Sequence, residues 1–319
     1  MVRALLFLTC ILIGLSLISS QLGHPFSFQK ESTDSLYNKL TEEEKRSPQF
    51  AVSALSTAKG VQVSLFASEP LLANPTVIDI DEKGRVWVCE ANNYRPAITG
   101  RAANPQGDRV LILEDTDGDG KADKSTVFYQ DPELNAPIGL WVVGNRAIVS
   151  QSPYVWLLTD TDGDDKADQK EVIFSGIDGE QHDHGIHSFV MGPDGKFYFA
   201  VGNEGKQILG KNGEPLKDKY GAIIDFKKYK QGLLLRCEED FTNLEVIGHN
   251  FRNNYEPAID SYGNIFQSDN DDDGNRGVRI NYILEHGNYG YTDELTGASW
   301  RGKRTNMEDS IPFRHWHLN

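Results

Sequence analysis

The chain has few cysteines and no excess of positive charge, and each scarcity excludes a class of protein. Only 3 of the 319 residues are cysteine, and no Cys-x-x-Cys-His occurs, so the chain attaches no c-type haem. Lys and Arg number 32 against 47 Asp and Glu, for a formal net charge of -15. Nucleic-acid binding relies on clusters of Lys and Arg that release counterions from phosphates, so this balance argues against a nucleic-acid partner.

A long apolar run is missing too. The most apolar segment, Ala4 to Leu17, is shorter than the roughly 20 residues that a membrane helix needs. Arg3 precedes it and Ser19 and Ser20 follow it, which is the order of charge, apolar core and exit in a signal peptide. Residues 1–20 are therefore predicted to be a signal peptide, and the mature chain to be periplasmic or extracellular with no integral membrane span.

Beyond this leader the sequence has the composition of a folded protein, with 25% charged and 10% aromatic residues. Residues 21–59 are predicted to be a lead-in segment and residues 60–319 one all-β domain. Cys89 and Cys237 lie outside the leader. In an oxidising compartment they could pair or stay buried and unpaired, and the sequence leaves both outcomes open.

Two local patterns predict where regular structure begins. A short helix is expected from Thr33 or Ser35, which can cap it, through Lys45, because Pro48 stops it. Val61 to Ala67 alternates apolar and polar residues, which predicts a first strand. From there on, short β-rich runs are separated by Gly, Asn, Asp and Pro turns.

One pattern occurs four times in this region: two β-rich runs joined by a tight turn at a glycine. The four hairpins span residues 77–88, 140–149, 189–199 and 258–266, and their turn glycines are Gly84, Gly144, Gly195 and Gly263. These glycines are 60, 51 and 68 residues apart. One β-meander at an interval near fifty residues is typical of propeller blades, whose sheets bury their faces against neighbouring sheets. The sequence therefore predicts a β-propeller in preference to a sandwich.

A second repeat, rich in aspartate, lies between the hairpins. Asp115-Thr-Asp117-Gly-Asp119 recurs forty-five residues later as Asp160-Thr-Asp162-Gly-Asp164, each time between two β-rich runs. Asp-Gly pairs commonly make turns, but alternate carboxylates in a tight loop also suit Ca2+, which takes about six to eight oxygen ligands. Crowded carboxylates repel one another unless a cation neutralises them, which favours calcium. The candidate ligands are Asp115, Asp117, Asp119 and Asp123 in the first loop and Asp160, Asp162, Asp164, Asp168 and Glu171 in the second.

Two further clusters could carry chemistry. The acidic loop Asp269-Asn-Asp271-Asp-Asp273-Gly-Asn-Arg276 follows a strand directly, so Asp271 and Asp273 are further candidate calcium ligands near the propeller axis. The run His182-Asp-His184-Gly-Ile-His187 holds three histidines within six residues, as a metal site can, but zinc usually needs further ligands. A polar loop at the entry to a blade explains these histidines equally well.

Several runs resemble known families. Asp183-His184, Gly192 to Gly205, Gly248-His-Asn-Phe-Arg252-Asn253, Gln267-Ser-Asp-Asn270 and His286-Gly-Asn-Tyr-Gly290 together resemble the soluble quinoprotein glucose and sorbosone dehydrogenases. Over residues 60–319 the chain also resembles the N-terminal propeller domain of bacterial membrane-bound dehydrogenases. This second resemblance is carried by Phe66-Ala-Ser-Glu-Pro70, Gly84-Arg-Val-Trp-Val88 and Ser268 to Arg279.

The first resemblance implies a six-bladed propeller that binds pyrroloquinoline quinone (PQQ) and calcium. It implies a sugar or alcohol as substrate and a c-type cytochrome as electron acceptor. His184 matches the base that takes the substrate's hydroxyl proton, and Arg252 matches the cation that holds negative charge on the quinone. Asn253 and Asn270 match cofactor-contacting positions.

The four hairpins are fewer than a six-bladed propeller needs. The basic residues that clamp the cofactor in the quinoproteins would follow Asn319, so the C-terminal blades are expected to be missing from this chain. Two functions stay open on the sequence: a quinone-dependent dehydrogenase domain, and a noncatalytic, calcium-stabilised propeller that binds carbohydrate or a protein partner.

Overall fold

The computed structural model describes residues 39–100, 102–177, 182–204, 207–270, 278–293 and 297. The predicted signal peptide, Asp271 and Asp273 lie outside these residues. The chain divides into two compact units: the first ends at Ser68 and includes Gly118–Lys121, and the second takes in Glu69–Asp117 and the residues from Ala122 on. Among the described residues, no helix has both the length and the apolar character needed to cross a membrane.

The first unit contains short helices. In the part that the structure describes they are α3 (Glu42–Arg46), α4 (Pro48–Ala51) and η1 (Val52–Ala54). Thr41 caps α3, because its hydroxyl accepts the backbone N–H of Glu44 while the Glu44 carboxylate accepts the backbone N–H of Thr41. The predicted caps Thr33 and Ser35 lie outside the described residues, and the described helix α3 ends at Arg46, next to the predicted end at Lys45. Pro48 opens the next helix, at a position where its missing N–H leaves no hydrogen bond unmade.

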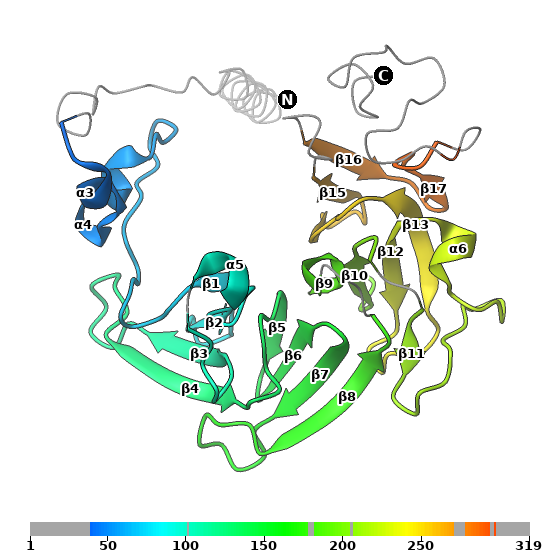
Figure 1. Ribbon diagram of the computed structural model, residues 1–319, viewed down its shortest axis with the longest axis horizontal. Helices are drawn as coiled ribbons and strands as arrows, with labels where there is room; N and C mark the ends of the chain where they lie inside the picture. The colour runs from blue at the N-terminus through cyan, green and yellow to red at the C-terminus, as the bar shows by residue number, and fades with distance from the viewer. Residues whose placement is uncertain are drawn as a thin grey trace, which may run out of the picture. The chain divides into compact units, whose positions relative to one another are not determined.

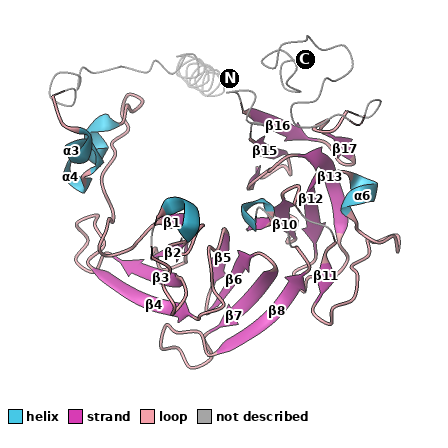
Figure 2. Ribbon diagram, viewed as in Figure 1, coloured by secondary structure: helices cyan, strands magenta, loops and turns pink. Residues whose placement is uncertain are grey.

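Strands make up most of the regular structure of the second unit (Figure 2) and form four sheets that follow one another in chain order (Figure 1). These sheets are the blades of a β-propeller, as the sequence predicted. Blade 1 contains β1 (Pro75–Ile80), β2 (Val86–Glu90), β3 (Arg109–Glu114) and β4 (Lys124–Gln130). Blade 2 contains β5 (Gly139–Val143), β6 (Arg146–Gln151), β7 (Tyr154–Thr159), β8 (Gln169–Ser175) and the edge strand β11 (Leu209–Gly210).

The other two blades follow the same plan. Blade 3 contains β9 (Ile186–Met191), β10 (Phe197–Val201), β12 (Gly232–Cys237), β13 (Glu245–Phe251) and β17 (Gly287–Asn288). Blade 4 contains β14 (Pro257–Ile259), β15 (Ile265–Asp269) and β16 (Arg279–Ile283). All neighbours pair antiparallel except β13 and β17. The short helices α5 (Pro96–Thr99), η2 (His182–His184) and α6 (Phe226–Tyr229) lie in connections between strands.

Each of the four predicted hairpins is confirmed as the first strand pair of a blade. The turn residues Gly84, Gly144, Gly195 and Gly263 have φ values of 78°, 58°, 74° and 83°. Glycine reaches this left-handed region without steric cost, which explains its recurrence at the turn. By contrast, residues 61–67 form no strand, although their alternating pattern predicted one.

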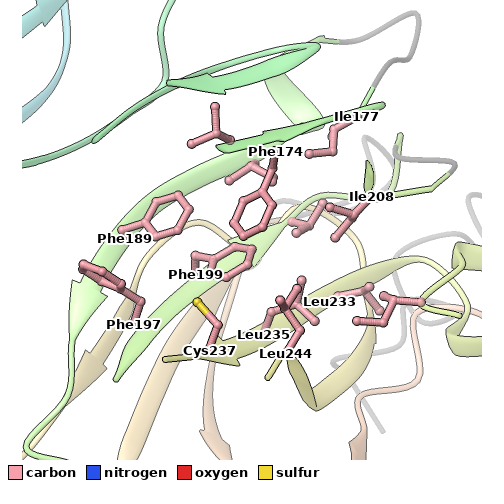
Figure 3. Packing of buried hydrophobic residues seen from close by; sticks show 14 of the residues in the cluster. Phe174, Ile177, Phe189, Phe197, Phe199, Ile208, Leu233, Leu235, Cys237 and Leu244 are labelled. Carbon is pink, nitrogen blue, oxygen red and sulfur yellow. The ribbon is translucent and has the colours of Figure 1, made fainter. Parts of the chain in front are cut away.

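The blades stack through apolar side chains that alternate along their strands. On β10, Phe197 and Phe199 pack against blade 2, whereas Tyr198 packs against blade 4. Figure 3 shows the cluster between blades 2 and 3, where the ring centroids of Phe189 and Phe199 are 4.5 Å apart and those of Phe174 and Phe199 are 5.6 Å apart. Each internal sheet thus buries both of its faces.

The two described cysteines pack in different clusters. Cys89 lies between blades 1 and 2 and Cys237 between blades 2 and 3, and both are free. Burial raises the pKa of Cys237 to about 12 and raises that of Cys89 as well, so both thiols are protonated and unreactive. Of the two outcomes that the sequence left open, the structure has the unpaired one.

The strand order places the loops at two opposite ends of the blades. We call the end where each blade's first strand begins the entry end, and the opposite end, which carries the hairpin glycines, the turn end. Because neighbouring strands run antiparallel, the connections β2–β3, β8–β9, β10–β12, β13–β14 and β15–β16 lie at the entry end. The connections β3–β4 and β7–β8, which hold the acidic repeats, lie at the turn end.

Hydrogen bonds join adjacent blades at the entry end. The hydroxyl of Thr76 donates to the carbonyl of Pro137 at 2.6 Å, and that of Ser150 donates to the carbonyl of Ile186 at 2.8 Å. A ring nitrogen of His187, at the start of β9, lies 2.7 Å from the carbonyl oxygen of Asn254, just before β14. These contacts tie the loops of the entry end to a rigid frame.

Candidate functional site

The structure brings three of the predicted site residues together at the entry end. His184 precedes β9, while Arg252 and Asn253 follow β13. A Cβ atom added to Gly202, just after β10, would lie 2.5 Å from both the carbonyl oxygen of His184 and Oδ1 of Asn253. Only glycine allows this approach, so Gly202 lets the two segments meet.

Asn203 connects the same segments, and sequence reasoning gave it no role. Its side-chain Oδ1 lies 2.7 Å from Nδ1 of His184, and its backbone N–H donates to the carbonyl of Arg252 at 2.8 Å. The run that contains it, Gly192 to Gly205, had been noted only as part of a family resemblance. No local pattern marks Asn203, because its partners lie in two other connections.

His184 is held as a neutral imidazole. Its side chain is buried, and burial lowers its pKa below the ordinary histidine value. The nearby guanidinium of Arg252 lowers this pKa further, while the hydrogen bond to Asn203 and the negative charges of Asp183 and Glu204 oppose the shift. A neutral ring at neutral pH has a free lone pair, which is what a general base needs.

Arg252 is a buried cation whose backbone is fixed by Asp269. The carboxylate of Asp269, 1% exposed at the end of β15, accepts the backbone N–H groups of Arg252 at 3.1 Å and Asn253 at 2.9 Å. Burial raises the pKa of Asp269, although the guanidinium of Arg279 at 3.0 Å works against that rise. Among the described carboxylates none forms an ion pair with the Arg252 side chain.

A loop of blade 1 reaches the residue next to His184. The Asp183 carboxylate accepts the Tyr94 hydroxyl at 2.9 Å and pairs with the Arg95 guanidinium at 2.7 Å. Burial opposes ionisation of Asp183, but Tyr94 and Arg95 outweigh it and hold the pKa below the ordinary aspartate value. Tyr94 and Arg95 were missed because about ninety residues separate them from their partner, and only folding brings them together.

Asn270 lies directly after β15, at the same end. Its side-chain Oδ1 is buried and has no hydrogen-bond partner among the described residues, and the same is true of Oδ1 of Asn253. Buried carbonyl oxygens are normally satisfied, so two orphaned acceptors at one end of the blades indicate a place where a ligand could supply donors. The adjoining candidate ligands Asp271 and Asp273 lie outside the described residues.

The two acidic repeats form hairpin loops of blades 1 and 2, at the turn end. Asp115, Asp117 and Asp123 each offer a carboxylate oxygen within 4.8 Å of the others. The equivalent residues Asp160, Asp162 and Asp168 form a second such group. In both loops a threonine hydroxyl closes the turn, from Thr116 to Asp123 at 2.8 Å and from Thr161 to Asp168 at 2.6 Å. The spacing of alternate aspartates therefore does bring carboxylates together.

Three other candidate ligands lie outside these groups. Asp119 accepts the backbone N–H of Lys121 at 2.8 Å, and Asp164 accepts that of Lys166 at 2.9 Å. Glu171 lies on β8, where its carboxylate is 3.4 Å from the amine of Lys211. Calcium binding by the loops stays a prediction, with three carboxylates per loop as its geometric basis.

Two surface pockets border Glu171 but none of the aspartates of the two loops. One, of about 710 Å³, runs along β7 and β8 and is lined by Lys170, Glu171 and Lys211 among others. The other, of about 250 Å³, lies between β8 and the β12–β13 turn and includes Phe174 and Phe241. Neither pocket includes His184 or Arg252.

Comparison with solved structures finds sugar dehydrogenases and a carbohydrate-active enzyme. The chain is similar to the holo form of the pyranose dehydrogenase PQQ domain from Coprinopsis cinerea, with 18% identity, a TM-score of 0.43, and coverage of 63% of this chain and 45% of that one. It is similar to the PQQ-bound aldose sugar dehydrogenase from Streptomyces coelicolor, with 16% identity, a TM-score of 0.49, and coverage of 72% and 66%. A calcium structure of a Trichoderma reesei carbohydrate-active enzyme of family AA12 has 16% identity, a TM-score of 0.46, and coverage of 72% and 57%.

The chain thus spans less than two thirds of the length of each of these three structures. No curated protein matches the sequence. The model of one protein family, described as a domain of unknown function (DUF7133), matches residues 47–314. This match covers most of the chain, and the protein therefore belongs to the DUF7133 family.

Proposed function

We propose that the propeller is an oxidoreductase domain that oxidises a sugar or alcohol hydroxyl, with His184 as the base. The observation that carries the proposal is a buried, neutral imidazole beside a buried guanidinium that has no carboxylate partner among the described residues. Removing hydride from a carbinol carbon requires that the hydroxyl proton leave as well, and His184 can accept it. Arg252 would stabilise the negative charge that develops on the hydride acceptor.

The residues at the entry end fit a bound quinone cofactor. PQQ, when bound, would supply the two-electron acceptor for the hydride. Arg252 provides a cation for an anionic oxygen, and the orphaned Oδ1 atoms of Asn253 and Asn270 provide acceptors for hydrogen-bond donors. Asp271 and Asp273, which follow Asn270 in the sequence, would complete a calcium site there. A c-type cytochrome outside the cell membrane would then take the electrons.

The test is reduction of a redox dye by the purified full chain, reconstituted with calcium and PQQ, across a panel of sugars and alcohols. We expect turnover that falls at least about 100-fold in His184→Ala, because general base catalysis contributes on that order. The matched control is His286→Asn, which changes an exposed histidine and should keep turnover. Melting temperatures of both variants should stay near that of the unchanged protein.

Turnover that survives His184→Ala would remove His184 from the reaction. If no substrate is oxidised, the second function is the better account: a noncatalytic propeller, stabilised by calcium, that binds carbohydrate or a partner protein. The convergence of three carboxylates in each acidic loop is the observation that favours it. Immobilised-glycan binding that depends on calcium, without turnover, would support this alternative.

A further inference from the structure

Asn203 contacts the ring of His184 and the backbone of Arg252 through different atoms. Its main chain fixes the backbone of Arg252, with N–H to carbonyl at 2.8 Å, and its side chain fixes the ring of His184 at 2.7 Å. It is the second residue after β10, the second strand of blade 3, so a regular strand determines its position. One residue therefore relates the ring of His184 to the segment that carries Arg252.

The direction of the Asn203 amide determines where His184 carries its proton. The amide Nδ2 donates to Oε1 of Gln231 at 3.3 Å, which turns Oδ1 toward the imidazole. A carbonyl oxygen can only accept a hydrogen bond, so Nδ1 of His184 must be the protonated nitrogen. The lone pair then lies on Nε2, on the side of the ring away from Asn203.

The charges around His184 make the neutrality of Asn203 important. Arg252 disfavours a second positive charge, and the neighbouring His187 does the same when it is protonated. Asp183 and Glu204 favour the charged ring, but Asp183 is already paired with Arg95 and bonded to Tyr94. A carboxylate at the position of Asn203, within hydrogen-bond distance of Nδ1, would stabilise the imidazolium far more than an amide does.

We propose that Asn203 is a positioning residue that keeps His184 neutral and protonated on Nδ1, so that Nε2 accepts the substrate proton. The assignment of the proton to Nδ1 stands on geometry alone. The role of Nε2 as an acceptor rests on the proposed function. The two parts can therefore be tested separately.

The first experiment uses no substrate. Long-range proton–nitrogen NMR spectra of the full chain, labelled at histidine, report which ring nitrogen carries the proton. The signals of His184 are those missing from His184→Gln. We expect the Nδ1-protonated pattern at neutral pH, and an Nε2-protonated pattern would overturn the proposal.

The second experiment changes the charge at the same site. In Asn203→Asp we expect the pKa of His184, followed by NMR titration, to rise by about one unit or more, as it does beside an opposite charge. The matched control is Asn212→Asp, which makes the same change at an exposed residue outside the site and should leave the titration in place. In Asn203→Leu, which keeps the backbone bond to Arg252, we expect the Nδ1 preference to be lost. A pKa that does not move in Asn203→Asp would overturn the proposal.

Activity supplies a separate readout. If the chain oxidises a substrate, kcat/KM should fall on the acid side at a higher pH in Asn203→Asp than in the unchanged protein. The difference in pH should equal the rise in the pKa of His184 that NMR measures. If no substrate is oxidised but the NMR results hold, the proton assignment of His184 stands and the proposed function fails. If a substrate is oxidised and the ring carries its proton on Nε2, the positioning role fails while the function stands.

Discussion

Arg85 of blade 1 joins Asp165 in the acidic loop of blade 2, with 2.8 Å between the guanidinium and the carboxylate. The same guanidinium pairs at 2.7 Å with the fully buried carboxylate of Asp81, which also accepts the indole N–H of Trp87 at 2.9 Å. Arg85 itself is only 9% exposed. A single buried cation thus connects the hairpin turn of one blade to the acidic loop of the next.

Replacing Arg85 should destabilise the protein more than an exposed ion pair would. In Arg85→Met the Asp81 carboxylate stays buried without its counter-charge, and breaking a buried pair in this way costs about 3–5 kcal/mol. Urea unfolding followed by tryptophan fluorescence measures the change. The control Lys166→Met breaks an exposed pair with Asp164 and should change stability by less than about 1 kcal/mol.

The pH dependence of stability gives a second check on Arg85. Although burial opposes it, the hydrogen bonds from Trp87 and Arg85 and the charge of Arg85 hold the pKa of Asp81 below its ordinary value. A lowered carboxylate pKa contributes stability that is complete above the unfolded value near pH 4 and is lost as pH falls through the folded value. Arg85→Met should therefore weaken this acid-side loss. If the unfolding free energy of Arg85→Met falls with pH as steeply as that of the unchanged protein, the ion pair with Arg85 does not set the pKa of Asp81.

Calcium should raise the melting temperature through the two acidic loops. If the ion binds only the folded state, calcium at about 100 times its dissociation constant adds about 2.7 kcal/mol per site. Asp160→Asn and Asp115→Asn each remove a carboxylate from one group, so each should reduce the calcium-dependent rise, and the double variant should lose the part of the rise that the two loops supply. Scanning calorimetry with calcium and with chelator measures this difference.

The control for the calcium experiment is Glu239→Gln, a loss of one negative charge at an exposed residue outside both loops. It should keep the full calcium-dependent rise in melting temperature. A wild-type melting temperature that is the same in calcium and in excess chelator would contradict calcium binding by the loops.

His187 should make the protein sensitive to mild acid. Burial lowers the pKa of His187 to about 4, and its ring stacks on Tyr255 with centroids 4.3 Å apart. Between the ordinary histidine value near pH 6.5 and about pH 4, the unfolded chain binds a proton that the folded chain does not, so stability falls as pH falls. The expected loss from this residue is about 3 kcal/mol.

The comparison of variants isolates this effect from other acid titrations. Denaturant midpoints at neutral pH and near pH 4 should differ less for His187→Gln than for the unchanged protein. His286→Asn, at an exposed histidine, should leave the difference as it is. If the denaturant midpoint falls equally between neutral pH and about pH 4 in all three proteins, His187 is not the source of the acid sensitivity.

Much of the fold, but less of the site, could be predicted from the sequence. The blade hairpins could be predicted because a glycine with positive φ and its flanking β-rich runs form a local signal, as at Gly195 and Gly263. Val61 to Ala67 shows the limit of that signal. Its pattern alternates, but a strand also needs a partner to pair with, and no local pattern reports one.

The candidate site residues also differ in whether a local sequence pattern predicts them. Asp160 and Asp168 belong to one loop, so their convergence follows from a turn whose sequence can be recognised. Glu171 was predicted to be a ligand of the same loop, but it lies beyond the loop, on strand β8, which begins at Gln169. Asn203 meets His184 and Arg252 only when the strands of blade 3 have paired, and Tyr94 meets Asp183 only when blade 1 and blade 3 have come together. Neither convergence is encoded in a local spacing.

Gly202 offers a steric test of how the entry end is assembled. In Gly202→Ala the new methyl group would lie 2.5 Å from two oxygen atoms, on His184 and Asn253, so one segment has to move. We expect a loss of about 1–3 kcal/mol in unfolding free energy, as for overpacked cores, and an altered NMR signal of His184. Gly248→Ala is the control, because its closest contact would be 3.2 Å from a tyrosine ring carbon, and its effect should be smaller.

The two ends of each blade are built from different connections of the same strands. Because a strand's register is determined by its pairing along the sheet, a change of length or sequence in an entry-end connection leaves the hairpins of the turn end in place. Loops such as those at His184 and Arg252 can therefore change in length or sequence without displacing the acidic loops at Asp115 and Asp160. The same strands thus present the proposed reacting groups at one end and the acidic repeats at the other, so each set can be altered without shifting the register of the other.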